Sequence, residues 1–167
     1  FPDFANSKEN IARDLALAKD AGFTDIVVDV RPTTGDVLFK TNLVDQVKFM
    51  YAWIGSNYTK VERTATWDYL QAFVDEARKQ GLRIHAAINT FVGGNQIDGG
   101  TGLLYRDQSK AEWATQMNMQ VGIISVMNTS ESTKFFNPAH PEVQTFLCDL
   151  LKDLAGYDLD GIFLDRG

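Results

Sequence analysis

The chain alternates between two hydrophobic periods, and this alternation predicts three copies of one helix–strand unit. In three segments apolar residues recur at helical spacing, and a glycine lies at or just after the end of each. The predicted helices are residues 7–21, 67–80 and 141–154. A short apolar run follows each helix within a few residues, as expected for a buried strand. The predicted strands are residues 25–30, 83–89 and 161–165.

The lengths of the connecting loops select the architecture. Helices that alternate with strands indicate a parallel sheet, which is either doubly wound or closed into a barrel. Loops 33–66 and 90–139 are long and both follow strands, whereas the turns from helix to strand are only a few residues long. This asymmetry is typical of a (β/α)8 TIM barrel. No dinucleotide-binding glycine fingerprint follows a strand, and we interpret the glycine-rich stretches at 93–94 and 99–102 as flexible loop.

The number of strands predicts an incomplete barrel. A TIM barrel has eight strands and typically about 250 residues. The 167-residue chain contains three secure strand patterns and a further hairpin pattern around residues 121–127. We therefore predict an α/β fold in which residues 1–167 form the N-terminal part of one barrel domain, about units one to four, truncated before closure.

Period-two alternation assigns the strand residues to two faces of the sheet. The apolar set suits the helix layer and comprises Ile26, Val28, Val30, Ile84, Ala86, Ile88, Ile162 and Leu164. The opposite set faces the barrel axis and comprises Val27, Asp29, Arg31, His85, Ala87, Asn89, Gly161, Phe163 and Asp165. Each strand thus ends on an inward polar residue: Arg31, Asn89 or Asp165. Because this edge is the catalytic face of a TIM barrel, we expect these residues to line a substrate site.

Each candidate also has a structural interpretation. A strand-end aspartate after an apolar run is costly to bury without a purpose, which favours a functional Asp165 over a loop or cap residue. Arg31 either faces a substrate or pairs with Asp29. Asn89 either contacts substrate or caps a loop. His85 lies deeper in its strand, which favours a satisfied interior histidine over a substrate contact.

The charge and composition of the chain argue against several classes of partner and cofactor. The net charge is −6 and the 16 Lys and Arg residues are scattered, so we expect no nucleic-acid partner. No apolar run approaches the roughly 18 residues of a membrane span. The two histidines, His85 and His140, lack metal-ligand spacing, and we expect neither metal nor cofactor. Cys148 is the single cysteine and falls on a helical apolar stripe, which predicts a buried side chain.

Aromatic residues are frequent on or beside the long loops. They are Tyr51, Trp53, Tyr58, Trp67, Tyr105 and Trp113. Exposed rings in such loops stack on sugar faces, whereas buried rings pack in the core. Taken one at a time, core packing is the favoured interpretation of each.

Three blocks of the sequence resemble glycosyl-hydrolase-like family 10. Residues 21–39 read AGFTDIVVDVRPTTGDVLF, with an Arg-Pro pair after the strand and a Gly-Asp loop. Residues 69–91 read YLQAFVDEARKQGLRIHAAINTF, with a strand that ends in Asn. Residues 135–167 read FFNPAHPEVQTFLCDLLKDLAGYDLDGIFLDRG, the most specific of the three. The resemblance covers most of the chain except an insertion at 95–132.

This resemblance implies a (β/α)8 barrel that acts on carbohydrate, often in exported bacterial proteins that are periplasmic, cell-surface or secreted. It implies that Arg31, Asn89 and Asp165 line the sugar site, with Asp29 and His85 as further candidates. The Asp-Gly-x-x-x-Asp ending is similar to that of amylase-type barrels, which makes Asp165 the nucleophile. In such barrels the second carboxylic acid comes from a later strand, here beyond Gly167. Asp29 is a poor substitute, because Arg31 beside it is expected to keep it ionised.

Three functions follow from these features. The leading hypothesis is a glycoside hydrolase of poly- or oligosaccharide that uses two carboxylates, with Asp165 as nucleophile. The alternative is a barrel that binds carbohydrate without cleaving it, through Arg31, Asn89 and loop aromatics. A metal-dependent hydrolase is disfavoured by the lack of clustered ligands.

Overall fold

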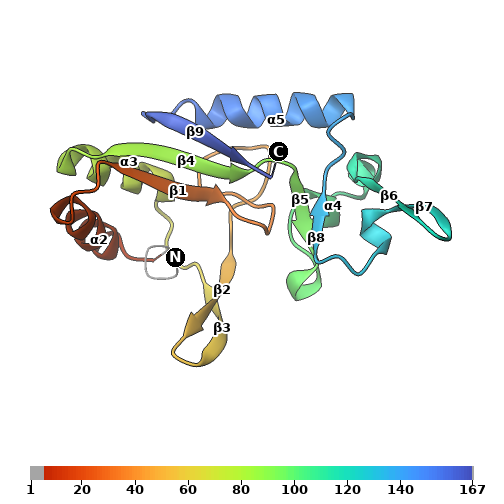
Figure 1. The fold of residues 1–167 in the computed structure, drawn as a ribbon, viewed down its shortest axis with the longest axis horizontal. Helices are drawn as coiled ribbons and strands as arrows, with labels where there is room; N and C mark the ends of the chain where they lie inside the picture. The colour runs from red at the N-terminus through yellow and green to blue at the C-terminus, as the bar shows by residue number, and fades with distance from the viewer. Residues whose placement is uncertain (1–5, 167) are drawn as a thin grey trace.

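The computed structural model describes residues 6–166 and contains a parallel sheet with its helices packed on one side (Figure 1). The strand order is β1-β4-β9, and both pairings are parallel. The strands are β1 (Asp25–Arg31), β4 (Arg83–Asn89) and β9 (Gly161–Asp165). The helices that precede them are α2 (Lys8–Asp20), α3 (Tyr69–Gln80) and α5 (Pro141–Leu154). The three predicted helix–strand units are confirmed, and their arrangement is consistent with part of a barrel.

Each helix begins at a capping side chain. Ser7 Oγ accepts a hydrogen bond from the backbone N–H of Asn10, as its N-cap position predicts. α3 begins two residues later than the sequence predicts, because Asp68 is the N-cap and its extended backbone cannot belong to the helix. His140 Nδ1 caps α5. These caps satisfy backbone donors that a helix leaves unpaired, and so fix where each unit starts.

The predicted apolar face of the sheet forms the core. Its buried members are Val28, Val30, Ile84, Ala86 and Ile88. They pack against the apolar stripes of the helices, which include Leu70, Phe73, Val143, Leu147 and Leu150. Leu164 pairs with Ile88 and so lies on the helix side, yet it is 52% exposed. Its expected burial is therefore wrong: β9 is an outer strand of this sheet, and no other strand pairs with its free edge among residues 6–166.

The long loops contain small antiparallel sheets of their own. Strands β2 (Phe49–Ile54) and β3 (Asn57–Glu62) form a hairpin after β1 that the sequence analysis treats only as loop. The predicted hairpin near residues 121–127 exists, but it is formed by β6 (Gln116–Met119) and β7 (Gly122–Ser125). β5 (Val92–Asn95) pairs with β8 (Thr133–Phe135). The remaining short elements are η1 (Ile97–Gly99), α4 (Leu103–Arg106), η2 (Gln108–Trp113) and η3 (Val126–Asn128).

Two sequence expectations about loop glycines and the cysteine are wrong. Gly94 belongs to β5, and a Cβ atom there would lie 2.5 Å from the Thr101 carbonyl oxygen. A Cβ atom on Gly102 would lie 2.6 Å from the Gly93 carbonyl oxygen. These glycines therefore permit close backbone packing rather than flexibility. Cys148 is exposed, because the buried stripe of α5 passes through its neighbour Leu147 instead.

Candidate active site at the carboxyl edge of the sheet

The parallel register brings Asp29, Asn89 and Asp165 to one edge of the sheet. Asn89 pairs with Asp165, and Asp29 pairs with Ala87 one pleat away. Because side chains alternate between faces, all three belong to the face opposite the helix layer. Val27 and Phe163 on this face are 60% and 58% exposed, so the face is open to solvent. The sequence thus correctly places these polar residues near one another.

Asp165 is an exposed carboxylate at the end of β9. Its Oδ1 accepts the backbone N–H of Arg166 at 2.8 Å, and its carbonyl oxygen accepts the backbone N–H of Thr90 at 2.7 Å. Arg166 has a φ of 49°, in the left-handed region. The carboxylate is therefore oriented by the turn of the chain that follows it and retains a second oxygen that faces solvent.

Arg31 lies in a different environment from the one that the sequence predicts. A register irregularity after Asp29 places Arg31 opposite Ile88, and the side chain is completely buried. Its guanidinium donates to the carbonyl oxygens of Asn89, Thr90 and Val92 at 2.5, 3.0 and 2.5 Å. The expectations of a substrate-facing side chain and of a guanidinium–Asp29 ion pair are both corrected by this geometry. Arg31 instead holds the turn that follows β4.

The guanidinium of Arg31 remains charged although the side chain is buried. Desolvation lowers the pKa of the guanidinium to about 10, while the nearby carboxylates of Asp36 and Asp29 raise it. The group therefore remains protonated at neutral pH. Asn89 completes the connection between β1 and β4, because its Nδ2 donates to the Arg31 carbonyl oxygen at 2.9 Å. Asn89 is itself buried, so its amide supports the edge of the sheet more than it faces outward.

The pKa of Asp29 is shifted in the opposite direction from the one that the sequence predicts. Part of the residue reaches solvent, but protein atoms desolvate its carboxyl, and this desolvation raises its pKa. The backbone N–H of Arg31 lowers this pKa, and the nearby charge of Asp165 raises it. The sequence predicts that the charge of Arg31 lowers the pKa of Asp29. Desolvation outweighs that charge, because the Arg31 guanidinium points into the core. Asp29 therefore holds its proton to higher pH than an ordinary aspartate.

A hollow of about 310 Å³ lies beside Asp29, between β1 and the helices α2 and α3. Its other lining residues are mostly apolar and come from α2, β1 and α3: Asp14, Leu15, Ile26, Val27, Val28, Tyr69 and Phe73. Apolar walls of this kind disfavour the ionised form of a carboxyl group. The hollow is thus a physical reason for the raised pKa of Asp29.

His85 lies at the opposite end of the sheet from Asp165. Its Nε2 lies 2.8 Å from Asp25 Oδ1, and the Arg83 guanidinium donates to both Asp25 oxygens at 2.7 Å. Gly161 leaves room for the ring, since a Cβ atom there would lie 2.8 Å from His85 Nδ1. His85 is therefore a half-buried side chain that is hydrogen-bonded to Asp25 and lies apart from the carboxyl edge.

Asp36 is a buried carboxylate that the sequence analysis did not single out. Arg106 of α4 donates to its Oδ1 through both terminal nitrogens. Desolvation raises the pKa of Asp36 to about 6, and the charge of Arg106 lowers it by less. The sequence feature that marks this position is the Gly-Asp pair after β1. Gly35 has a φ of 81°, a left-handed conformation that glycine readily adopts and that forms the turn before Asp36. Asp36 fastens the loop after β1 to the loop after β4.

The loop aromatics separate into buried and exposed groups. Trp113 is buried, and Trp67 and Tyr105 are half-buried. On the β2–β3 hairpin, by contrast, Trp53 is 70% exposed and Tyr58 is 57% exposed. Core packing is therefore the correct interpretation for Trp113 and is wrong for Trp53 and Tyr58, which lie on a projecting hairpin.

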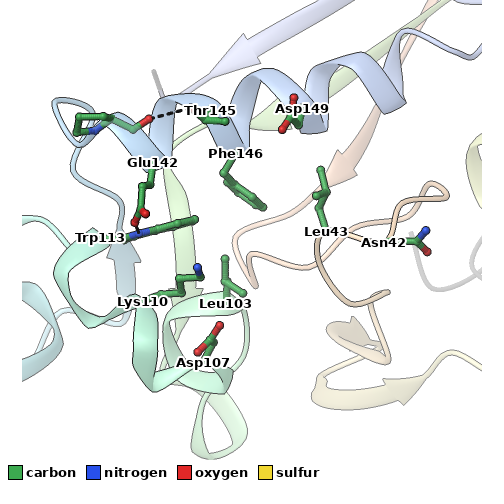
Figure 2. A pocket seen from close by; sticks show the side chains of 11 residues that line it. Asn42, Leu43, Leu103, Asp107, Lys110, Trp113, Glu142, Thr145, Phe146 and Asp149 are labelled. Carbon is green, nitrogen blue, oxygen red and sulfur yellow. Dashed lines mark hydrogen bonds between the residues drawn. The ribbon is translucent and has the colours of Figure 1, made fainter.

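A cavity of about 520 Å³ lies beside α5, lined also by residues of the loops that follow β1 and β4 (Figure 2). Trp113 and Phe146 line it, and Trp113 Nε1 donates to Glu142 Oε2 at 2.9 Å. Neither Asp29 nor Asp165 contributes to its lining. Among residues 6–166, no three His, Cys, Asp or Glu side chains gather where they could hold a metal ion. Within the same range no helix is long and apolar enough to cross a membrane.

Comparison with known proteins places this geometry in a family. A model of the family described as Glycosyl hydrolase-like 10 matches residues 1–166. A curated relative, the S-layer-related protein of Niallia circulans, is 29% identical over 164 residues; the match covers 95% of this chain and 10% of that protein. A crystal structure of a hypothetical protein from Ruminiclostridium thermocellum ATCC 27405 superposes with a TM-score of 0.61 at 14% identity, covering 99% of this chain and 73% of the other. The last similarity bears on the fold alone.

Proposed function

The chain belongs to the glycosyl hydrolase-like 10 family, and from this premise we propose that it cleaves glycosidic bonds in poly- or oligosaccharide with Asp165 as the nucleophile. A carbohydrate-related function follows from the family itself. The observation that carries the finer proposal is the position of the Asp165 carboxylate, which is exposed at the carboxyl end of a parallel strand. In TIM barrels this is the edge where catalytic groups gather.

The reaction needs two carboxyl groups in different protonation states. The Asp165 carboxylate attacks the anomeric carbon while a carboxylic acid gives its proton to the departing glycosidic oxygen. The glycosyl ester on Asp165 is then hydrolysed by water, whose proton returns to the acid. We propose that the acid comes from a later strand of the barrel, outside residues 1–167.

Asp29 is the candidate acid within the chain. Desolvation raises its pKa above the usual value of an aspartate, which is the direction that a general acid requires, and the charge of Asp165 adds to this shift. This observation supports a role that the sequence alone argues against. Asp29 therefore stands as the second candidate for the acid.

Binding without cleavage is the alternative function. The exposed rings of Trp53 and Tyr58 favour it, because such rings stack on sugars without any catalytic group. The name of the Niallia circulans relative, S-layer-related protein, supports a location at the cell surface, in line with the expected export. In this alternative the carboxyl edge supplies hydrogen bonds to the glycan rather than a nucleophile.

Substitution of Asp165 separates the two functions. Asp165→Asn keeps the shape of the side chain and removes the nucleophile, so in a protein that also contains the strand supplying the acid we expect the release of reducing ends from a panel of soluble polysaccharides to fall by a factor on the order of 10³ or more. Asp158→Asn, in the turn before β9, is the matched control and should retain activity. Cleavage by Asp165→Asn at the wild-type rate would remove Asp165 from the mechanism. Glycan binding by a wild-type protein that cleaves none of the panel would favour the alternative.

A further inference from the structure

The β2–β3 hairpin carries a stack of aromatic rings on one face. Tyr51 and Trp53 alternate onto this face of β2, and Tyr58 pairs with Trp53 from β3. The Tyr51 and Tyr58 rings are stacked with centroids 5.3 Å apart, and the Trp53 and Tyr58 centroids are also 5.3 Å apart. The stack ends in Trp53, most of whose side chain is open to solvent.

Polar contacts hold the stack in place. Tyr51 Oη donates to Asp98 Oδ1 at 3.0 Å, and Lys60 forms an ion pair with the same carboxylate. The ammonium of Lys60 also lies 4.3 Å from the centroid of the Phe49 ring. Asp98 lies in η1, in the loop after β4, so these contacts join the hairpin to a second loop. The rings are thus pre-organised, which reduces the entropy lost when a ligand binds.

Backbone strain at Asp98 accompanies this contact. Asp98 has a φ of 53°, in the left-handed region that is unfavourable for most non-glycine residues. The conformation directs its carboxylate to Tyr51 and Lys60. The contacts of the Asp98 carboxylate with Tyr51 and Lys60 offset this unfavourable backbone conformation, and they hold the aromatic rings of the hairpin in place.

The aromatic and polar groups on this face of the β2–β3 hairpin indicate the class of ligand that it binds. Exposed rings in a cluster mark a binding surface. Here the aromatic faces adjoin the hydrogen-bonding groups of Lys60, Glu62 and Asp98, of which Lys60 and Glu62 lie 3.5 Å apart. A pyranose ring with equatorial hydroxyls has the complementary pattern, an apolar face of C–H groups surrounded by hydroxyls. The net charge of −6 disfavours the anionic alternatives, nucleic acid and acidic membrane lipid.

We propose that Tyr51, Trp53 and Tyr58 form a sugar-stacking site for chains of glucose or N-acetylglucosamine. The site lies in the loop after β1, and the loops after the parallel strands are those that surround the carboxyl edge in a barrel. A glycan held there is anchored apart from the bond that is cleaved. This inference rests on the proposed function for its carbohydrate class, but it does not require Asp165 to be a nucleophile.

The opposite face of the same hairpin provides a matched control. Ile54 is adjacent to Trp53 on β2, points to the other face and is 56% exposed. Ile54→Ala therefore removes a similarly exposed apolar side chain from the same hairpin end without touching the stack. Trp53→Phe keeps an aromatic face at the site.

Calorimetric titration of the full chain with cellohexaose and chitohexaose tests the site, with thermal melting as the check on folding. We expect wild type to bind at least one hexasaccharide, Trp53→Ala to weaken that binding about tenfold or more, and Trp53→Phe and Ile54→Ala to stay within about threefold of wild type. The titration measures binding without a cleavage step, so failure of the nucleophile proposal would leave this result standing. Trp53→Ala binding as tightly as wild type, or wild type binding neither sugar, would overturn the site. If Trp53→Ala instead abolishes self-association in sedimentation while no sugar binds, the hairpin is a protein contact and the proposal fails.

Discussion

Arg31 contacts Asp29 through its backbone N–H, at 3.1 Å from Oδ1, while its guanidinium turns away into the core. The guanidinium there donates to three backbone carbonyl oxygens of the turn after β4. This single side-chain orientation has two consequences. It turns the guanidinium away from the face that carries Asp29, whose pKa is raised, and it makes the carboxyl edge dependent on a buried charge.

Replacement of Arg31 tests the second consequence. Arg31→Lys keeps the charge but cannot reach three carbonyl groups at once, so donors and acceptors stay buried without partners. We expect a loss of about 2–4 kcal/mol in the free energy of unfolding, measured in urea. Arg83→Lys, at an exposed ion pair with Asp25, is the control and should change stability by less than about 1 kcal/mol. Equal stability of Arg31→Lys and wild type would contradict the bonding described for the guanidinium.

The pKa of Asp29 should depend on the charge of Asp165. The pKa of Asp29 is raised, in part by the charge of Asp165. Asp165→Asn removes that charge, so the pKa of Asp29 should fall while remaining above that of an exposed aspartate because desolvation persists. Carbon NMR of the labelled Asp29 carboxyl group measures this pKa in wild type and in Asp165→Asn. A pKa of Asp29 that does not respond to Asp165→Asn would show that the two groups do not interact.

The buried carboxyl of Asp36 predicts a pH dependence of stability. Its pKa is about 6 in the folded chain and 3.8 in the reference state, so the folded state binds more protons between these values. The stability contributed by Asp36 is complete below about pH 4 and is lost as the pH rises through about 6. We expect Asp36→Asn to remove a decrease on the order of 2 kcal/mol across this window, measured by urea unfolding at several pH values. An unchanged pH profile in Asp36→Asn would contradict the raised pKa.

The helix–strand units were predictable because local signals agree with tertiary packing. Ser7 caps the first helix, Gly81 has the left-handed φ of 69° that ends the second, and Pro141 opens the third. Alternation along β1 and β4 separated buried Val28 and Ile84 from the open face. These signals depend on residues near in sequence, which is why they can be recognised without coordinates.

The parts that the sequence did not predict depend on distant contacts. The register irregularity after Asp29 moves Arg31 into the core, and strict alternation along the strand cannot anticipate it. The burial of Asp36 depends on Arg106, 70 residues away. The β2–β3 hairpin was missed because its exposed rings, such as Trp53, lack the buried–polar alternation of a core strand. The sequence therefore predicted that Asn89 and Asp165 share one edge of the sheet, but not the raised pKa of Asp29 or the burial of Arg31.

A covalent bond between Asp165 and a sugar is the most direct evidence for the proposed chemistry. The measurement is peptide mass spectrometry after incubation with activated 2-deoxy-2-fluoro glycosides, which slow the second step of a retaining reaction. The account predicts a glycosyl adduct on the peptide that contains residues 161–166, and no adduct in Asp165→Asn. Cleavage of glycan with the adduct on another carboxylate, or with the label still attached in Asp165→Asn, would contradict it.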